Sequence, residues 1–109
     1  MSEDRPAPPP DRLDRLYRIA SHYAARFPED ATALGYLSRL TEELGEIAVE
    51  VQRLEGAPTK LAKHGPGTLR DLASEVEDLL HTALGLVRHY QAEAEFDAVL
   101  DEQYRRVTG

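Results

Sequence analysis

The stretch LSRLTEELGEIAVEVQRL, residues 37–54, decides the fold, and LRDLASEVEDLLHTALGL, residues 69–86, repeats its pattern. In both stretches apolar residues recur at alternating steps of three and four, which is the spacing of one face of an α-helix. The two sets are Leu37, Leu40, Leu44, Ile47, Val51 and Leu54, and Leu69, Leu72, Val76, Leu79, Ala83 and Leu86. The sequence therefore predicts two equivalent amphipathic helices.

Each stretch also carries two acidic residues separated by two others, Glu43 and Glu46 in the first, Glu75 and Asp78 in the second. With Leu37 at zero, a turn of about 100° per residue places the apolar stripe between roughly 260° and 360°, with Glu43 near 240° and Glu46 near 180°. Because the second stretch has the same arrangement, packing the two stripes together should gather all four carboxylates along one edge. Such a cluster is costly unless a cation neutralises it.

Composition limits the class of protein. The chain has 109 residues, 41% hydrophobic and 30% charged, which indicates one small domain that would gain from oligomerisation because a small monomer buries little surface. It has no cysteine, which rules out thiolate metal sites and fits a cytoplasmic setting. A net charge of −7 argues against nucleic acid as a partner. We also expect neither a signal peptide nor a membrane span, since the first residues are acidic and then proline-rich.

The chain divides into a short tail and one helical domain. The prolines in residues 1–10 predict a mobile proline-rich tail, and residues 11–109 form the domain. Asp11 is placed to cap a first helix that Pro28 ends, and a second helix is expected from about residue 29 to 54. A helix of that length spans about 40 Å, which exceeds the ~26 Å expected for a compact monomer of this size. We therefore predict that a second subunit covers it.

Glycines and prolines mark residues 55–67 as a connecting loop. The loop carries Lys60 and Lys63 in an otherwise acidic protein, and a solvated basic loop is favoured over a phosphate-contacting one. Thr68 and Asp71 have capping-box spacing and predict the start of a third helix. That helix either runs on or bends near residues 91–95 before a last helix. The fold class is thus an all-α helical bundle of three or four helices per chain, completed by oligomerisation.

The two acidic pairs carry a resemblance to a known family. The residues LTEELGEI, 40–47, followed by EVEDLL, 75–80, resemble the ExxE…ExxD signature of the MazG-like, all-α nucleoside triphosphate pyrophosphohydrolases, over roughly residues 30–90. The resemblance implies an Mg²⁺-dependent hydrolase that converts a nucleoside triphosphate to monophosphate and pyrophosphate, as in nucleotide-pool house-cleaning. It also implies a homodimer or homotetramer. The catalytic and metal-binding residues would be Glu43, Glu46, Glu75 and Asp78.

This chain departs from the family pattern in two ways. Glu77 stands where family members often have glycine, and the Lys-Asn element of many members is missing because the chain has no asparagine. Positive charge toward the substrate phosphates would then come from elsewhere. The candidates are Lys60, Lys63, Arg105 and Arg106.

Other interpretations remain open. The run Asp78-Leu79-Leu80-His81 is similar to phosphoribosyl-ATP pyrophosphohydrolases, although the helical angle of His81, near 120°, points it away from the stripe. Glu50 is either a further ligand or, as we favour, a solvated glutamate. The tyrosines are expected in the core rather than as a base-stacking platform. The non-enzymatic alternative is a helical interaction module whose acidic residues form a solvated face.

Overall fold

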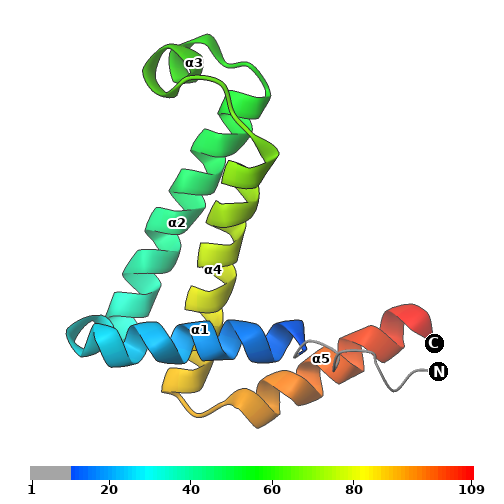
Figure 1. Ribbon diagram of the computed structural model, residues 1–109. Coiled ribbons are helices and arrows are strands. Elements are labelled where there is room, and N and C mark those ends of the chain that lie inside the picture. Colours follow the sequence, from blue (N-terminus) through cyan, green and yellow to red (C-terminus); the bar gives the residue numbers. More distant parts are fainter. Residues whose placement is uncertain (1–10) are drawn as a thin grey trace, which may run out of the picture.

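The computed structural model describes residues 11–109 as an all-α fold (Figure 1). The elements are α1 (Arg12–Arg26), the 3₁₀ turn η1 (Pro28–Asp30), α2 (Ala33–Leu54), α3 (Pro58–His64), α4 (Leu69–His89) and α5 (Glu93–Thr108). The all-α prediction is confirmed. The described part has five α-helices where three or four were expected. The predicted proline-rich tail, residues 1–10, lies outside the described residues.

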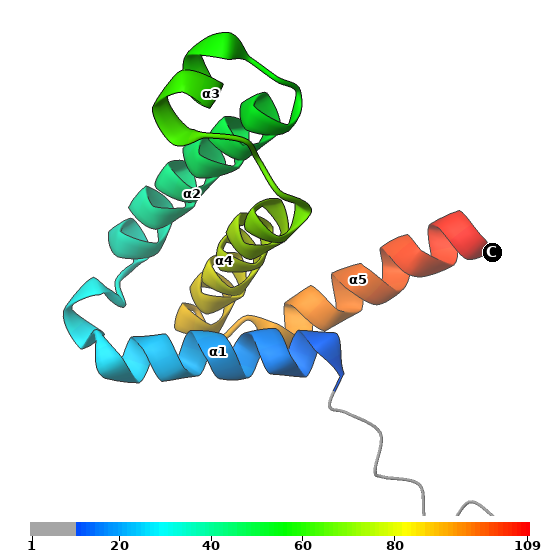
Figure 2. The same ribbon diagram turned by 45° about the horizontal axis from the view of Figure 1, so that its top comes forward.

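A long helical hairpin forms the body of the molecule. α2 and α4 run side by side in opposite directions and make the most extensive contact of the fold. α1 crosses this hairpin near one end and packs mainly on α4, as Figures 1 and 2 both show. α3 lies at the opposite end of the hairpin, and α5 extends away from the end of α4 (Figure 2). Within residues 11–109 no helix is long and apolar enough to cross a membrane.

Local capping residues fix where the helices begin. Asp11 accepts a hydrogen bond from the backbone N–H of Leu13 at 2.8 Å, and Thr68 accepts one from Asp71 at 3.0 Å, so the predicted starts of α1 and α4 are confirmed. The predicted start of the second helix at residue 29 is wrong. Pro28–Asp30 form the 3₁₀ turn instead, and α2 begins at Ala33 because Thr32 caps it.

The predicted loop at residues 55–67 contains the short helix α3. Pro58 stands in its first turn, where the missing N–H has no helical partner to lose. Gly56 and Gly65 flank it with φ near +80°, a conformation that favours glycine. Gly and Pro therefore mark the two ends of a short helix here and do not exclude one.

The end of α4 decides between the two sequence predictions for the C-terminal region. α4 ends at His89, and Gln91 adopts a left-handed conformation with φ of 54° before α5 begins. The bent alternative is therefore correct. α5 has no buried residue, and its apolar side chains Val99, Leu100, Tyr104 and Val107 are exposed.

Tyr36 and Gly85 set the distance between α2 and α4. Tyr36 is only 5% exposed, and a Cβ atom added to Gly85 would lie 2.6 Å from its ring. The glycine therefore lets the two helices approach over the tyrosine. Besides Tyr36, the buried apolar residues in the described part are Ala20 and Leu84.

The contact face of α2 is rotated away from the predicted stripe. Glu43 and Glu50 are buried in the hairpin, whereas Leu37 and Leu44 are more than half exposed. The exposed row, here called the α2 seam, has a spacing of alternating three and four residues and contains no charge. It consists of Leu34, Leu37, Thr41, Leu44, Ala48 and Val51, all exposed. Such spacing is typical of a surface that packs on another helix.

Candidate metal centre

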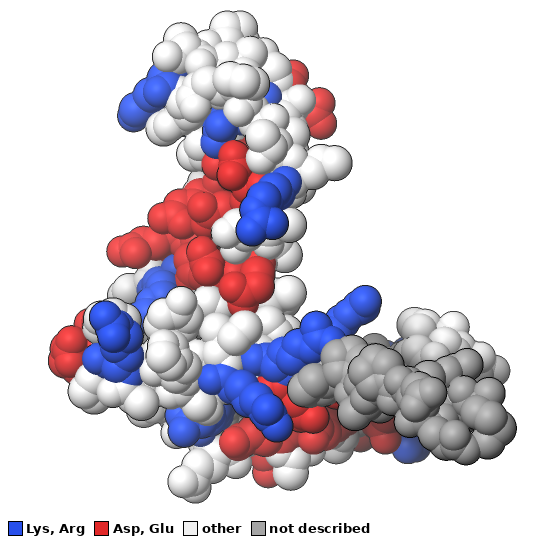
Figure 3. All heavy atoms as spheres, viewed as in Figure 1, with Lys and Arg blue, Asp and Glu red and all other residues white. Residues whose placement is uncertain are grey.

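The four predicted carboxylates gather in the middle of the hairpin. Figure 3 shows an acidic patch over α2 and α4 on the side where α1 crosses. Glu43 is only 6% exposed and Glu46 is exposed on α2, while Glu75 and Asp78 on α4 are half-buried. Glu46 is close enough to Glu75 for the two carboxyl groups to share a hydrogen bond. The four carboxylates come together as expected, but Glu43 lies inside the contact between α2 and α4 and not along its edge.

Mutual repulsion and burial perturb three of these groups. The neighbouring carboxyl group of Glu46, within hydrogen-bonding reach, raises the pKa of Glu75 to about 7, and burial and the other negative charges add to the effect. Burial also raises the pKa of Glu43, with a partly opposing hydrogen bond from Thr82. Asp78 has a raised pKa because of burial and then the charge of Glu77. The cluster therefore favours binding either protons or a cation.

Two carboxylate oxygen atoms at the cluster have no partner. Oε1 of Glu43 and Oε2 of Glu75 are inaccessible to solvent and make no hydrogen bond among the described residues. Buried polar atoms are rarely left unpaired in native proteins, so each such atom calls for an explanation. Hard oxygen ligands of this kind suit Mg²⁺, which is commonly held by a few carboxylates, waters and substrate phosphates. The donor set therefore fits the metal that the acidic pairs imply.

An open groove of about 420 Å³ leads to the carboxylates. At the acidic end it is lined by Glu43, Glu46 and Asp78, and near α1 by the rings of Tyr23 and Phe27. These rings lie nearly parallel with centroids 6.5 Å apart, and both side chains are about 40% exposed. One groove thus joins an anionic end to an aromatic wall.

Three residues of this groove were not singled out as binding residues from the sequence. Tyr23 was expected in the core with the other tyrosines, and Phe27 had no assigned role, but α1 ends here and leaves both rings at the groove. Their spacing of four residues at the end of a helix was the available signal. Arg39, one helical turn before Glu43, supplies the positive charge of the groove and forms no ion pair with any residue of the described range 11–109.

His81 is buried, contrary to the direction inferred from its helical angle. It is 6% exposed because α1 covers that side of α4, and its ring stacks on Tyr23 with centroids 5.2 Å apart. The helical angle of His81 was measured from the apolar stripe of its own helix. It therefore could not show that α1 packs on the opposite side of α4. His81 also lines the groove.

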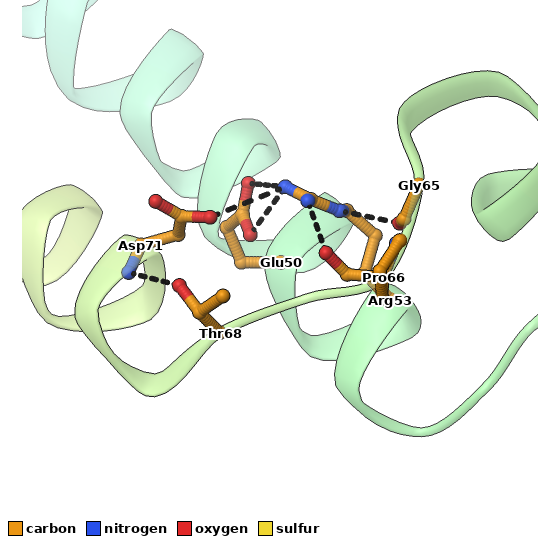
Figure 4. Close-up of polar contacts among 6 residues, drawn as sticks. All are labelled: Glu50, Arg53, Gly65, Pro66, Thr68 and Asp71. Carbon is orange, nitrogen blue, oxygen red and sulfur yellow. Dashed lines mark hydrogen bonds and ion pairs between the residues drawn. The ribbon is translucent and has the colours of Figure 1, made fainter.

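Glu50 is likewise buried rather than solvated, and Arg53 is its partner (Figure 4). One guanidinium nitrogen, Nη1, donates to both oxygens of Glu50 at 2.8 and 2.9 Å. The same side chain donates to the carbonyl oxygens of Gly65 and Pro66, at 3.0 and 2.6 Å, and so ties the segment after α3 to α2. Glu50 is therefore already neutralised and is poorly suited to be a further metal ligand.

The four predicted phosphate-binding residues do not line the groove. Lys60 and Lys63 lie on α3, which packs on α2 at the far end of the hairpin from α1 (Figure 1). Arg105 and Arg106 are exposed on α5, where Arg105 pairs with Asp101 at 3.1 Å. Within this chain Arg39 is better placed, and a phosphate role for the other four stays a prediction.

No family model, curated protein or solved structure matches this chain.

Proposed function

We propose that this chain is an Mg²⁺-dependent nucleoside triphosphate pyrophosphohydrolase of cytoplasmic nucleotide house-cleaning. The observation that carries the proposal is the pair of unpartnered, buried oxygen atoms of Glu43 and Glu75 in the middle of the hairpin, close to a groove with aromatic walls. A nucleotide has the matching form, with phosphates that need a cation at one end and a flat base at the other.

Glu43, Glu46, Glu75 and Asp78 would hold the metal. Bound Mg²⁺ would neutralise charge on the triphosphate and lower the pKa of an attacking water. Without a cation the carboxylates repel a triphosphate, so substrate binding should depend on metal. Arg39 lies close enough to Glu43 for its positive charge to lower the pKa of that carboxyl group. It also lines the groove, where it would attract phosphate oxygens. Cleavage between the α- and β-phosphates follows from the resemblance of the acidic pairs.

Tyr23 and Phe27 would receive the base. Both rings border the groove and are partly exposed, so they offer aromatic surface to a base, while His81 covers one face of Tyr23 and Arg26 lies over one face of Phe27. Stacking on an aromatic ring is worth about 1–3 kcal/mol per base and tolerates any base, because every base has a π-face. The wall therefore supports nucleotide binding without naming a base.

We also propose that the enzyme is a homodimer that packs through the α2 seam. The equivalent positions on α4, 32 residues later, also leave Leu69 and Leu80 exposed. Together these side chains form an exposed apolar surface that an identical copy could cover, and stable interfaces bury about 1,200 Å² or more in total. The seam lies about 180° around α2 from Glu46, which leaves the groove open.

A nucleotide panel tests the enzymatic proposal. Each nucleoside triphosphate is incubated with the protein and Mg²⁺, and pyrophosphate and orthophosphate are measured separately. We expect pyrophosphate and a nucleoside monophosphate, and no product when the metal is chelated. Orthophosphate release with a diphosphate product would contradict the reaction type. If no nucleotide is hydrolysed and Mg²⁺ does not bind, the chain is better explained as a helical interaction module.

A further inference from the structure

Asp30 is an acidic residue of the groove that the proposed metal centre does not use. It is the last residue of η1, and it lines the groove together with Tyr23, Phe27 and Arg39. Its carboxylate makes no hydrogen bond or ion pair with any residue between 11 and 109. The side chain therefore offers both of its oxygen atoms as acceptors to a ligand in the groove.

The backbone of Asp30 is held by the segments on both sides of η1. Its N–H donates to the carbonyl oxygen of Phe27 at 3.1 Å, so a single tight turn connects the carboxylate to the aromatic wall. Its carbonyl group lies against Gly35 at the start of α2, where a Cβ atom would overlap it. A side chain on a backbone fixed in this way is presented to a ligand at a defined place.

Asp30 and Arg39 lie between the aromatic wall and the acidic centre. Both line a small pocket whose walls include Tyr23 and Phe27. Both also line an adjoining groove of about 260 Å³ that the two aromatic residues do not reach. Arg39 is in turn close enough to Glu43 to lower the pKa of that carboxyl group. The order along the groove is therefore the aromatic rings, then Asp30 with Arg39, then the carboxylates.

A nucleoside triphosphate has its parts in the same order. With the base at the aromatic rings and the phosphates at Arg39 and the metal, the sugar lies beside Asp30. A ribose carries its 2′- and 3′-hydroxyl groups on the same face of the ring, and each can donate a hydrogen bond to one carboxylate oxygen. Hydrogen bonds to an ionised acceptor are roughly twice as strong as those between neutral groups. A 2′-deoxyribose keeps only one of these two donors.

We propose that Asp30 binds the 2′- and 3′-hydroxyl groups of the substrate, so that the enzyme prefers ribonucleoside to deoxyribonucleoside triphosphates. The inference rests on the proposed function and specifies the sugar of its substrate. Stacking against the aromatic wall tolerates any base. A site that hydrogen-bonds a hydroxyl group, in contrast, rejects an analogue that lacks this group. Asp30 thus determines specificity without contacting the phosphorus that is attacked.

Substrates that differ at one hydroxyl group test this assignment. The ribo-, 2′-deoxyribo- and arabinonucleoside triphosphates of the base that the parent hydrolyses fastest are compared by kcat/KM with Mg²⁺. We expect ribose to be favoured at least about tenfold over 2′-deoxyribose, and also over arabinose, whose 2′-hydroxyl group lies on the opposite face of the ring. In Asp30→Ala the ribonucleotide should lose most, so that the preference falls to about twofold or less.

The matched control is Glu29→Ala, which removes the same charge one residue earlier. Glu29 is exposed and does not line the groove. This variant should therefore keep the preference for ribose. Because the preference is a ratio measured within one protein, it does not depend on how much of each variant is folded.

The outcomes separate this inference from the proposed function. Equal kcat/KM for ribo- and deoxyribonucleotides in an active parent would overturn the inference and leave the proposed function standing. A preference that survives in Asp30→Ala, or an arabinonucleotide that is hydrolysed as well as the ribonucleotide, would also overturn it. Hydrolysis of none of the nucleotides would contradict the proposed function as well.

Discussion

Glu43 stands at the centre of the hairpin with one oxygen bonded to Thr82 and the other without a partner. In the metal-free protein its charge is therefore poorly compensated, as the raised pKa of this carboxyl indicates. We expect Glu43→Gln to raise the free energy of unfolding of the metal-free protein by up to about 1 kcal/mol, because the amide removes a buried charge. The same variant should lose hydrolysis and most of the rise in melting temperature caused by Mg²⁺.

The matched control for this prediction is Glu102→Gln, an exposed glutamate on α5. It should change neither the stability of the metal-free protein nor the response to Mg²⁺. If melting curves show the same Mg²⁺ response for both variants and the parent, Glu43 does not belong to a metal site.

The raised pKa of Glu75 predicts how stability depends on pH. In the unfolded chain this carboxyl has the ordinary value of 4.5, and in the folded, metal-free protein it has a value of about 7. Between these values the native state holds the proton more tightly, so the stabilisation is complete below about pH 4.5 and is lost as pH rises through 7. We expect chemical denaturation at pH 5 and pH 8 without metal to show lower stability at pH 8, with a smaller difference in Glu75→Gln. A larger difference in that variant would contradict the assignment.

At the scale of the helices, replacing two different glycines with alanine should have opposite effects on stability. Gly85→Ala would place a methyl group 2.6 Å from the ring of Tyr36, so α2 and α4 must separate or the ring must move, at about 1–3 kcal/mol. The methyl group of Gly45→Ala would meet nothing within 4 Å. This change should stabilise α2 by about 0.5–1 kcal/mol, because alanine loses less conformational entropy on folding than glycine does. Urea unfolding of the two variants checks the contrast, and equal effects would mean that the helices are not closely packed at Gly85.

Local signals explain which helices could be predicted from the sequence. Asp11 and Thr68 satisfy backbone N–H groups of the residues that follow them, and α1 and α4 begin where the sequence indicated. The segment with α3 was mistaken for a loop because Pro58 and Gly56 are turn residues as well as helix boundaries. A short helix has too few residues to show a period.

Periodicity predicted the cluster of carboxylates but not its surroundings. The repeat of 32 residues placed Glu43 and Glu75 on equivalent faces, and the structure brings their cluster together. Which side of a helix is covered depends on its neighbours, so the burial of Glu50 in the α2–α4 hairpin and of His81 by α1 could not be read from one helix. The aromatic wall depends in the same way on where α1 crosses the hairpin.

At the scale of the whole molecule, the α2 seam predicts the quaternary structure. In light scattering at tens of micromolar we expect the parent to have twice the 12.2 kDa mass of the chain. Leu44→Glu should give the monomer mass, because Leu44 is 62% exposed in the middle of the seam and a charge there would be buried without a partner.

Val107→Glu is the matched control, since Val107 is 77% exposed on α5, away from the seam. It should leave the dimer intact. A parent that is monomeric while hydrolysing nucleotide would refute self-association, and dissociation by Val107→Glu alone would assign the interface to α5.

The short connection between α2 and α4 bears on the speed and order of folding. Only residues 55–68 separate the two helices, so the largest contact of the fold closes at a modest cost in loop entropy. The contacts of α1 with α4 join residues much further apart in sequence. The α2–α4 hairpin is the more local of the two contacts, and helical proteins rich in local contacts fold within microseconds to milliseconds. The hairpin should therefore form in the rate-limiting step, and the groove should appear only afterwards, when α1 docks and brings Tyr23 over His81.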